Sequence, residues 1–245
     1  MMIRLAVLII SLCSAFSVTA APLTVITDEW PPYNFQQKGK IVGISTELVE
    51  ATLQDAGYEY EIKSLPWKRA IVTTQKTPLT MMFTTARTSE REDLFKWVGP
   101  IHKGSVYLYK LKENSKLLIE SFEDIKRHRV AVLRGGAVES FLKKNGINEK
   151  NYIPVSYSEN LIPMLFAGRV DLIPGDELDL LYQLNKAGYK SADIEKAMLL
   201  YQKDYYIALN KEMPDEIVDR LQNSLNNIIY SEMPDQVIRS YILHD

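Results

Sequence analysis

Short apolar runs alternate with amphipathic segments along most of the chain, and this alternation predicts strands and helices in turn. The runs Leu23 to Thr27, Val130 to Leu133 and Val170 to Pro174 have the length and composition of buried strands. The segments between them place apolar residues at helical spacing. Strands that alternate with helices predict an α/β architecture with mostly parallel sheets.

The helical segments are marked by polar starts and glycine stops. Ser45 can cap a helix that ends at Gly57, and Gly146 and Gly188 can end two later helices. Further helices are expected over 138–145, 158–166, 176–187 and 215–231. The last of these repeats apolar residues every three or four positions, which is typical of a helix with one buried face.

The first twenty residues have the pattern of a cleavable secretory signal. Arg4 precedes the apolar run Leu5 to Phe16, and Val18-Thr19-Ala20 supplies the small residues that a signal peptidase reads. A run of about a dozen residues is too short to cross a bilayer of about 30 Å as a helix. We therefore expect residues 1–20 to be a signal peptide and the mature protein to lie in the periplasm.

Composition excludes several classes of function. The formal net charge is −2, and positive and negative residues are interspersed, so no nucleic-acid or membrane-binding patch is predicted. The single cysteine, Cys13, lies in the expected signal peptide, which leaves no disulfide. The histidines show no metal-ligand spacing, and the chain has no nucleophile elbow, P-loop or dinucleotide fingerprint. We expect no metal, no cofactor and no catalytic activity.

Several polar residues fall directly after predicted strands, where the ligands of α/β proteins bind. Asp28, Arg134 and Asp176 occupy such positions. Gly135-Gly136 follows Arg134, and its backbone amides could meet an anion, although a plain turn is the simpler interpretation.

Three arginines stand in two polar segments, Arg69 after Pro66-Trp67, and Arg87 and Arg91 four residues apart. A guanidinium group binds a carboxylate with two parallel hydrogen bonds, so each is a candidate for an anionic ligand. For any one of them a surface ion pair is the alternative, with Glu90, Glu92 or Asp93 as partner.

Two tryptophans are candidates for walls of a pocket. Trp30 and Trp67 lie in polar, proline-marked turns, whereas most other aromatic residues are expected in the core.

A series of short fragments follows in order along the chain: Leu23 to Asp28, Trp30-Pro-Pro-Tyr33, Gly39 to Gly43, Pro66-Trp-Lys-Arg69, Arg87-Thr-Ser-Glu-Arg91, Trp97-Val-Gly-Pro100, Arg129 to Leu133 and Ala167 to Asp171. Together they resemble family 3 of the bacterial extracellular solute-binding proteins, the polar amino acid binding components of ABC transporters. The similarity covers essentially the whole mature chain.

The resemblance implies a two-lobed periplasmic binding protein, in which each lobe is a mostly parallel sheet flanked by helices and two strands form the hinge. Lobe one would hold residues 22–106 and 206–245, and lobe two residues 107–205. The lobes would close around the ligand, in a protein that is expected to be a monomer.

The resemblance also implies roles for individual residues. Arg91 matches the arginine that clasps the α-carboxylate of the ligand, and Asp176 matches the aspartate that pairs with its α-ammonium. Asp28 matches an acid near the ligand side chain, and Trp30 and Tyr33 match aromatic residues of the first loop.

The match departs from the family pattern at the carboxylate. Residues 135–137, including Gly135, match a loop that offers amides and a hydroxyl, but Ala86 and Ala137 stand where hydroxyl residues are common. Arg69, Arg87 and Arg134 add positive charge near the same place. The ligand could therefore be more anionic than an amino acid, or its carboxylate could sit differently.

We expect a protein that binds a small polar or anionic ligand, an amino acid or a related carboxylate, and delivers it to an inner-membrane permease for ABC-type uptake. One alternative is an orphan binder or sensor that signals to a membrane receptor. The other is an enzyme similar to cyclohexadienyl dehydratases, in which Asp28, Glu29 or Glu177 would transfer protons.

Overall fold

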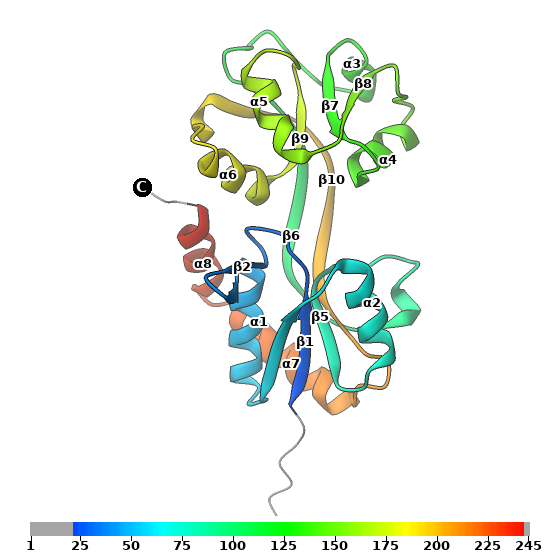
Figure 1. Ribbon diagram of the computed structural model, residues 1–245, viewed down its shortest axis with the longest axis vertical. Coiled ribbons are helices and arrows are strands. Elements are labelled where there is room, and N and C mark those ends of the chain that lie inside the picture. Colours follow the sequence, from blue (N-terminus) through cyan, green and yellow to red (C-terminus); the bar gives the residue numbers. More distant parts are fainter. Residues whose placement is uncertain (1–21, 243–245) are drawn as a thin grey trace, which may run out of the picture.

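The computed structural model describes residues 22–242 and has two α/β lobes joined by two long strands (Figure 1). The strands are β1 (Leu23–Thr27), β2 (Phe35–Gln37), β3 (Lys40–Val42), β4 (Tyr60–Ser64), β5 (Thr80–Ala86), β6 (Lys96–Leu111), β7 (Val130–Leu133), β8 (Tyr152–Val155), β9 (Ile173–Asp176) and β10 (Ile194–Leu209). The two-lobed α/β prediction is confirmed.

Helices cover both lobes. They are α1 (Ile44–Asp55), α2 (Trp67–Lys76), α3 (Phe122–Ile125), α4 (Ala137–Lys144), α5 (Leu161–Phe166), α6 (Glu177–Lys186), α7 (Asp215–Ile229) and α8 (Met233–Ile242), with 3₁₀ turns η1 (Glu92–Leu94), η2 (Ser158–Asn160) and η3 (Ser191–Asp193). Within residues 22–242, no helix combines the length and the apolar character needed to cross a membrane.

The main sheet has the strand order β4-β1-β5-β10-β6-β9. In the first lobe β1 pairs in parallel with both β4 and β5, and in the second β7 pairs in parallel with β8. The hinge strands β6 and β10 are antiparallel to each other and run through both lobes. Parallel strands place their carboxyl ends at one edge, and in each lobe loops that follow such strands carry predicted site residues.

Each face of the first sheet has its own core. On one face Val25, Phe83 and Ile207 pack with α1 and α7, and on the other Ile26 and Met82 pack with α2. The second lobe has separate apolar clusters around β7 and around α5 and α6. Each lobe is therefore held by its own buried side chains.

A second contact joins the lobes beside the hinge. Leu178 of α6 packs against the apolar cluster of the first lobe. The ring centroid of Phe35 lies 5.9 Å from that of Tyr182 and 6.0 Å from that of Tyr241 in α8. One flank of the molecule is thus bridged by aromatic packing in addition to β6 and β10.

The predicted bounds of individual strands and helices were only partly correct. The strands Leu23–Thr27 and Val130–Leu133 are observed as expected, but the third strand begins at Ile173 instead of Val170. Asp171 precedes it, and its carboxylate accepts hydrogen bonds from the backbone and guanidinium of Arg129. Ser45 is not the cap of α1, since Gly43 holds that position. The signal peptide prediction lies outside the described residues.

Candidate functional site

The predicted site residues all lie at or just beyond the ends of strands or at the starts of helices. Figure 1 shows β1 running toward the second lobe, so the loop after it faces the junction between the lobes. By segment, the residues are Asp28, Trp30 and Tyr33 after β1, Trp67 and Arg69 in α2, Arg87 and Arg91 after β5, Arg134 and Gly135 after β7, and Asp176 at the end of β9.

The loop after β1 is shaped by a buried asparagine. The amide nitrogen of Asn34 donates to the backbone oxygen of Asp28 at 2.8 Å and to its carboxylate at 3.2 Å. The backbone of Trp30 also bonds that of Asn34. Burial raises the pKa of Asp28, and the Asn34 hydrogen bond acts against that rise. The loop is therefore a fixed support for Trp30 and Tyr33.

Tyr33 connects the two lobes. Its hydroxyl donates to the carboxylate oxygen Oδ1 of Asp176, and the Asp176 side chain is buried, with 8 % exposed. The other oxygen, Oδ2, is buried without a hydrogen-bond partner. It faces Gly104, where an added Cβ would lie 2.9 Å from it. Burial raises the pKa of Asp176, and the Tyr33 hydroxyl lowers it.

Aromatic rings surround this contact. Tyr33 stacks on His102 with centroids 4.5 Å apart, and Trp30 lies 4.7 Å from Tyr33 and 5.2 Å from Tyr205. Nε2 of His102 lies 2.9 Å from the hydroxyl of Ser45. Burial, and secondarily the charge of Lys203, lowers the pKa of His102 to about 3, so this imidazole is neutral near pH 7.

Two charged residues join the cluster that the sequence did not single out, Lys203 and Asp179. The ammonium of Lys203 lies 5.4 Å from the Trp30 ring centroid and 5.0 Å from that of Tyr205. Among residues 22–242 it makes no ion pair within 4.0 Å, and burial lowers its pKa. Burial, together with the nearby Asp176, raises the pKa of Asp179 to about 6. The signal in the sequence that could have indicated Lys203 is its position two residues before the predicted lobe boundary at residues 205/206.

Arg91 and Trp67 form a second group. The guanidinium carbon of Arg91 lies 5.1 Å from the Trp67 ring centroid, and Nη1 donates to the backbone oxygen of Ala86 at 3.1 Å. Arg91 is half-buried, and no ion pair to it exists within the described part of the chain. This leaves most of its donors available to an anion.

Arg87 points elsewhere. Its Nε donates to the Glu92 carboxylate at 2.7 Å, and its guanidinium lies over the rings of Trp97 and Tyr206. The surface ion pair that the sequence offered as an alternative is therefore present for this arginine. Its exposed charge is already matched.

Arg69 and Arg134 are exposed, and within residues 22–242 neither side chain has a hydrogen-bond or ion-pair partner. Gly135 has a φ of 71°, which favours glycine, and its backbone N–H donates to Glu139 of the following helix. Glu139 therefore already supplies a negative charge at the start of α4.

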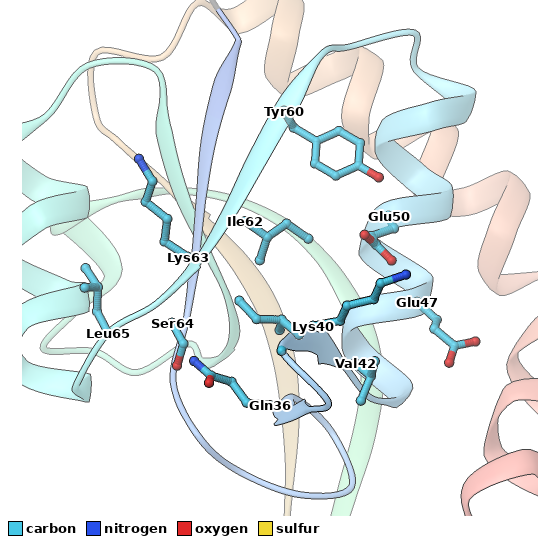
Figure 2. A pocket seen from close by; sticks show the side chains of 12 residues that line it. Gln36, Lys40, Val42, Glu47, Glu50, Tyr60, Ile62, Lys63, Ser64 and Leu65 are labelled. Atoms are coloured by element: carbon cyan, nitrogen blue, oxygen red, sulfur yellow. The ribbon is translucent and has the colours of Figure 1, made fainter.

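Two shallow hollows lie on the first lobe. The larger one, of about 870 Å³, is bounded by the β2–β3 hairpin, α1 and β4, and Figure 2 shows the side chains of Glu47, Glu50 and Lys40 along it. It contains none of the predicted site residues. The second, of about 600 Å³, is lined by Asp28, Glu29, Gln36, Ser64, Leu65, Pro66 and Trp67 and adjoins the loop after β1.

The two groups around Tyr33 and Arg91 present half-buried cations, aromatic side chains and carboxylates from both lobes. This combination is suited to binding a small charged molecule. No group of three or more histidine, cysteine or acidic side chains able to hold a metal occurs within residues 22–242.

The fold has close counterparts among solved structures. Substrate-binding domain 2 of Lactococcus lactis GlnP, in the open conformation, superposes with a TM-score of 0.72 at 19% identity, covering 93% of this chain and 99% of that one. A histidine kinase sensor domain similar to periplasmic binding proteins gives a TM-score of 0.69 at 16% identity, covering 91% and 97%. At these identities the likeness concerns the fold alone.

Sequence comparison places the chain more narrowly. The probable amino-acid-binding protein YxeM of Bacillus subtilis is 25% identical over 162 residues, which is 64% of this chain and 60% of that protein's length. The model of the bacterial extracellular solute-binding proteins, family 3, matches residues 23–243. The chain therefore belongs to family 3 of the bacterial extracellular solute-binding proteins.

Proposed function

We propose that this protein is a periplasmic solute-binding protein that closes its lobes around a small carboxylate ligand, an amino acid or a related carboxylate. Family membership supports the solute-binding role. YxeM, whose name describes a probable amino-acid-binding protein, supports the class of ligand.

The observation that carries the proposal is that the Arg91 guanidinium is half-buried and makes no ion pair within residues 22–242. A half-buried guanidinium without an ion pair has lost part of its hydration, and an anion that binds it restores the missing interaction. Trp67 and the Ala86 carbonyl hold the group in one orientation, so two of its N–H groups can meet a carboxylate in parallel.

Bending of the hinge strands β6 and β10 would let the two lobes close on a ligand. Asp176 belongs to the second lobe and Arg91 to the first under the predicted division at residues 106/107 and 205/206. A ligand that contacts both lobes stabilises the closed arrangement by its extra affinity for that state.

We place the protein beside an inner-membrane permease of the ABC type. The GlnP domain is a substrate-binding domain, whereas the sensor-domain counterpart belongs to a histidine kinase. Delivery to a permease is the proposed role, and delivery of a signal to a membrane receptor is the alternative. Growth on the bound solute as nutrient, in strains with and without the protein, separates the two.

Calorimetry tests the site. The wild-type protein is titrated with the common amino acids and with small carboxylates, and Arg91→Ala with whichever binds. Loss of one partner of a desolvated charge pair is expected to weaken binding by roughly a hundredfold or more. Arg220→Ala is the matched control, because Arg220 also lies over an aromatic ring, that of Tyr58, but belongs to α7. Wild-type affinity in Arg91→Ala would refute the proposed site.

A further inference from the structure

The hinge strand β10 presents a cation that the proposed carboxylate site does not use. Tyr201, Lys203 and Tyr205 lie at alternate positions in a regular stretch of β10, so their side chains share one face. Opposite Lys203 on β6 is Gly104, which has no side chain to cover it. The Lys203 ammonium is thus held over Trp30 and Tyr205, without an ion pair among residues 22–242.

Lys203 is close to the group that binds the first carboxylate. Arg91 is anchored on the carbonyl of Ala86, and Ala86 pairs with Tyr205, two residues from Lys203 along β10. From strand spacing, the Cα atoms of Ala86 and Lys203 are about 8 Å apart. The Arg91 guanidinium, held at the Ala86 carbonyl, and the long side chain of Lys203, which starts about 8 Å from Ala86, can therefore reach the two ends of one short molecule.

Neither oxygen of the acid that would receive an ammonium group is open to a ligand. Oδ1 of Asp176 accepts the Tyr33 hydroxyl, and Oδ2 is buried against Gly104. An ammonium from a ligand would have to displace Tyr33 to reach Oδ1, and the buried Oδ2 would have to be uncovered. Lys203 already supplies positive charge to this acidic region, since its charge lowers the pKa of both Asp176 and Asp179.

We propose that Lys203 binds a second anionic group of the ligand, and that the ligand is a small dicarboxylate without an ammonium group. This inference rests on the proposed function, in which Arg91 takes the first carboxylate, and it makes Lys203 the residue that selects between an organic diacid and the amino acid of the same skeleton. A half-buried cation that already has aromatic walls gains more from an anion than from a second cation.

The test compares matched pairs of probes by isothermal titration calorimetry: succinate with L-aspartate, and glutarate with L-glutamate. The wild-type protein is expected to bind at least one diacid, and to bind its amino acid counterpart at least about tenfold more weakly. Lys203→Met is expected to weaken diacid binding by about tenfold or more, because a charge-assisted contact is lost, while Lys203→Arg keeps it.

Lys103→Met is the matched control. Lys103 is an exposed lysine on β6 that pairs with Asp204, so its side chain lies on the opposite face of the hinge from Lys203. Its replacement is expected to change diacid affinity by less than about twofold. Circular dichroism and thermal unfolding establish that each variant is folded.

Four outcomes would overturn the inference, in whole or in part. If the wild-type protein binds an amino acid more tightly than its diacid, the inference is wrong but the proposed function stands. The same holds if both diacids fail to bind and another amino acid binds in an Arg91-dependent way. Unchanged diacid affinity in Lys203→Met would remove the role of Lys203 alone. Absence of binding by every amino acid and carboxylate tried would overturn this inference and the proposed function together.

Discussion

Asp179→Asn should stabilise the protein at neutral pH, by an amount that depends on pH. Burial, with the charge of Asp176 nearby, raises the pKa of Asp179 from 3.8 to about 6 in the folded protein. The folded state therefore binds the proton more tightly than the unfolded state does. The resulting stabilisation is complete below pH 3.8 and is lost as the pH rises through about 6. Asparagine does not titrate, so the variant escapes this loss.

The size of the effect follows from the two pKa values. At about 1.4 kcal/mol for each pH unit, the interval from 3.8 to about 6 corresponds to about 3 kcal/mol at pH 7. Asp179 is half-buried and its carboxylate accepts a hydrogen bond from Gln183 at 3.3 Å, which the amide oxygen of asparagine can also accept. For a chain of this size, about 3 kcal/mol corresponds to a rise in Tm of roughly 6–12 °C.

Thermal unfolding of both proteins from pH 4 to pH 8 measures the difference. The Tm gap between Asp179→Asn and the wild type is expected to be smallest at pH 4, to open through pH 6 and to level off above pH 7. Asp219→Asn, at an exposed position of α7, is the control for replacing an aspartate by an asparagine. A gap that is constant across this range, or that widens toward low pH, would refute the assigned titration of Asp179.

Two further predictions concern the contact between the lobes. Gly104→Ala should lower the free energy of unfolding by about 1–3 kcal/mol, because the added Cβ would lie 2.5 Å from the Tyr205 ring and 2.9 Å from the Asp176 carboxylate. Urea unfolding measures this against Ser105→Ala on the same strand, and equal midpoints would contradict it. Tyr33→Phe should cost about 1–3 kcal/mol at pH 7, because Asp176 loses its hydrogen-bond donor. The same substitution should cost less at pH 4, where Asp176 is protonated more fully, and a loss that grows on acidification would count against the assigned contact.

The fold could be predicted largely from the sequence, because many of its elements are specified by their own residues. The apolar runs of β1 and β7 and the glycines after α1, α4 and α6, all with positive φ, set the strands and helix ends locally. The start of β9 was predicted at Val170 and lies at Ile173. Asp171, just before the strand, bonds Arg129, which is 42 residues away in the sequence, and no local pattern indicates such a contact.

The candidate site was predictable only in part. Sequence could place Arg87 and Arg91 in one polar segment, but it could not tell which is paired. Glu92, Trp97 and Tyr206 engage Arg87, and the last two reach it through strand pairing in the sheet. Lys203 was missed for the same reason, since it meets Trp30 only when β10 is in register.

The passage of β6 and β10 through both lobes also sets the order in which the chain can fold. In the first lobe β5 pairs with β10 through Ala86 and Tyr205, which are 119 positions apart in sequence. During synthesis or export, the sheet of that lobe thus lacks a central strand until nearly the whole chain has emerged. The loop-closure entropy of bringing those ends together falls if the intervening segment has already become compact. We therefore expect the second lobe to acquire structure first, and completion of the first sheet to limit the folding rate, as is general for pairings of high sequence separation.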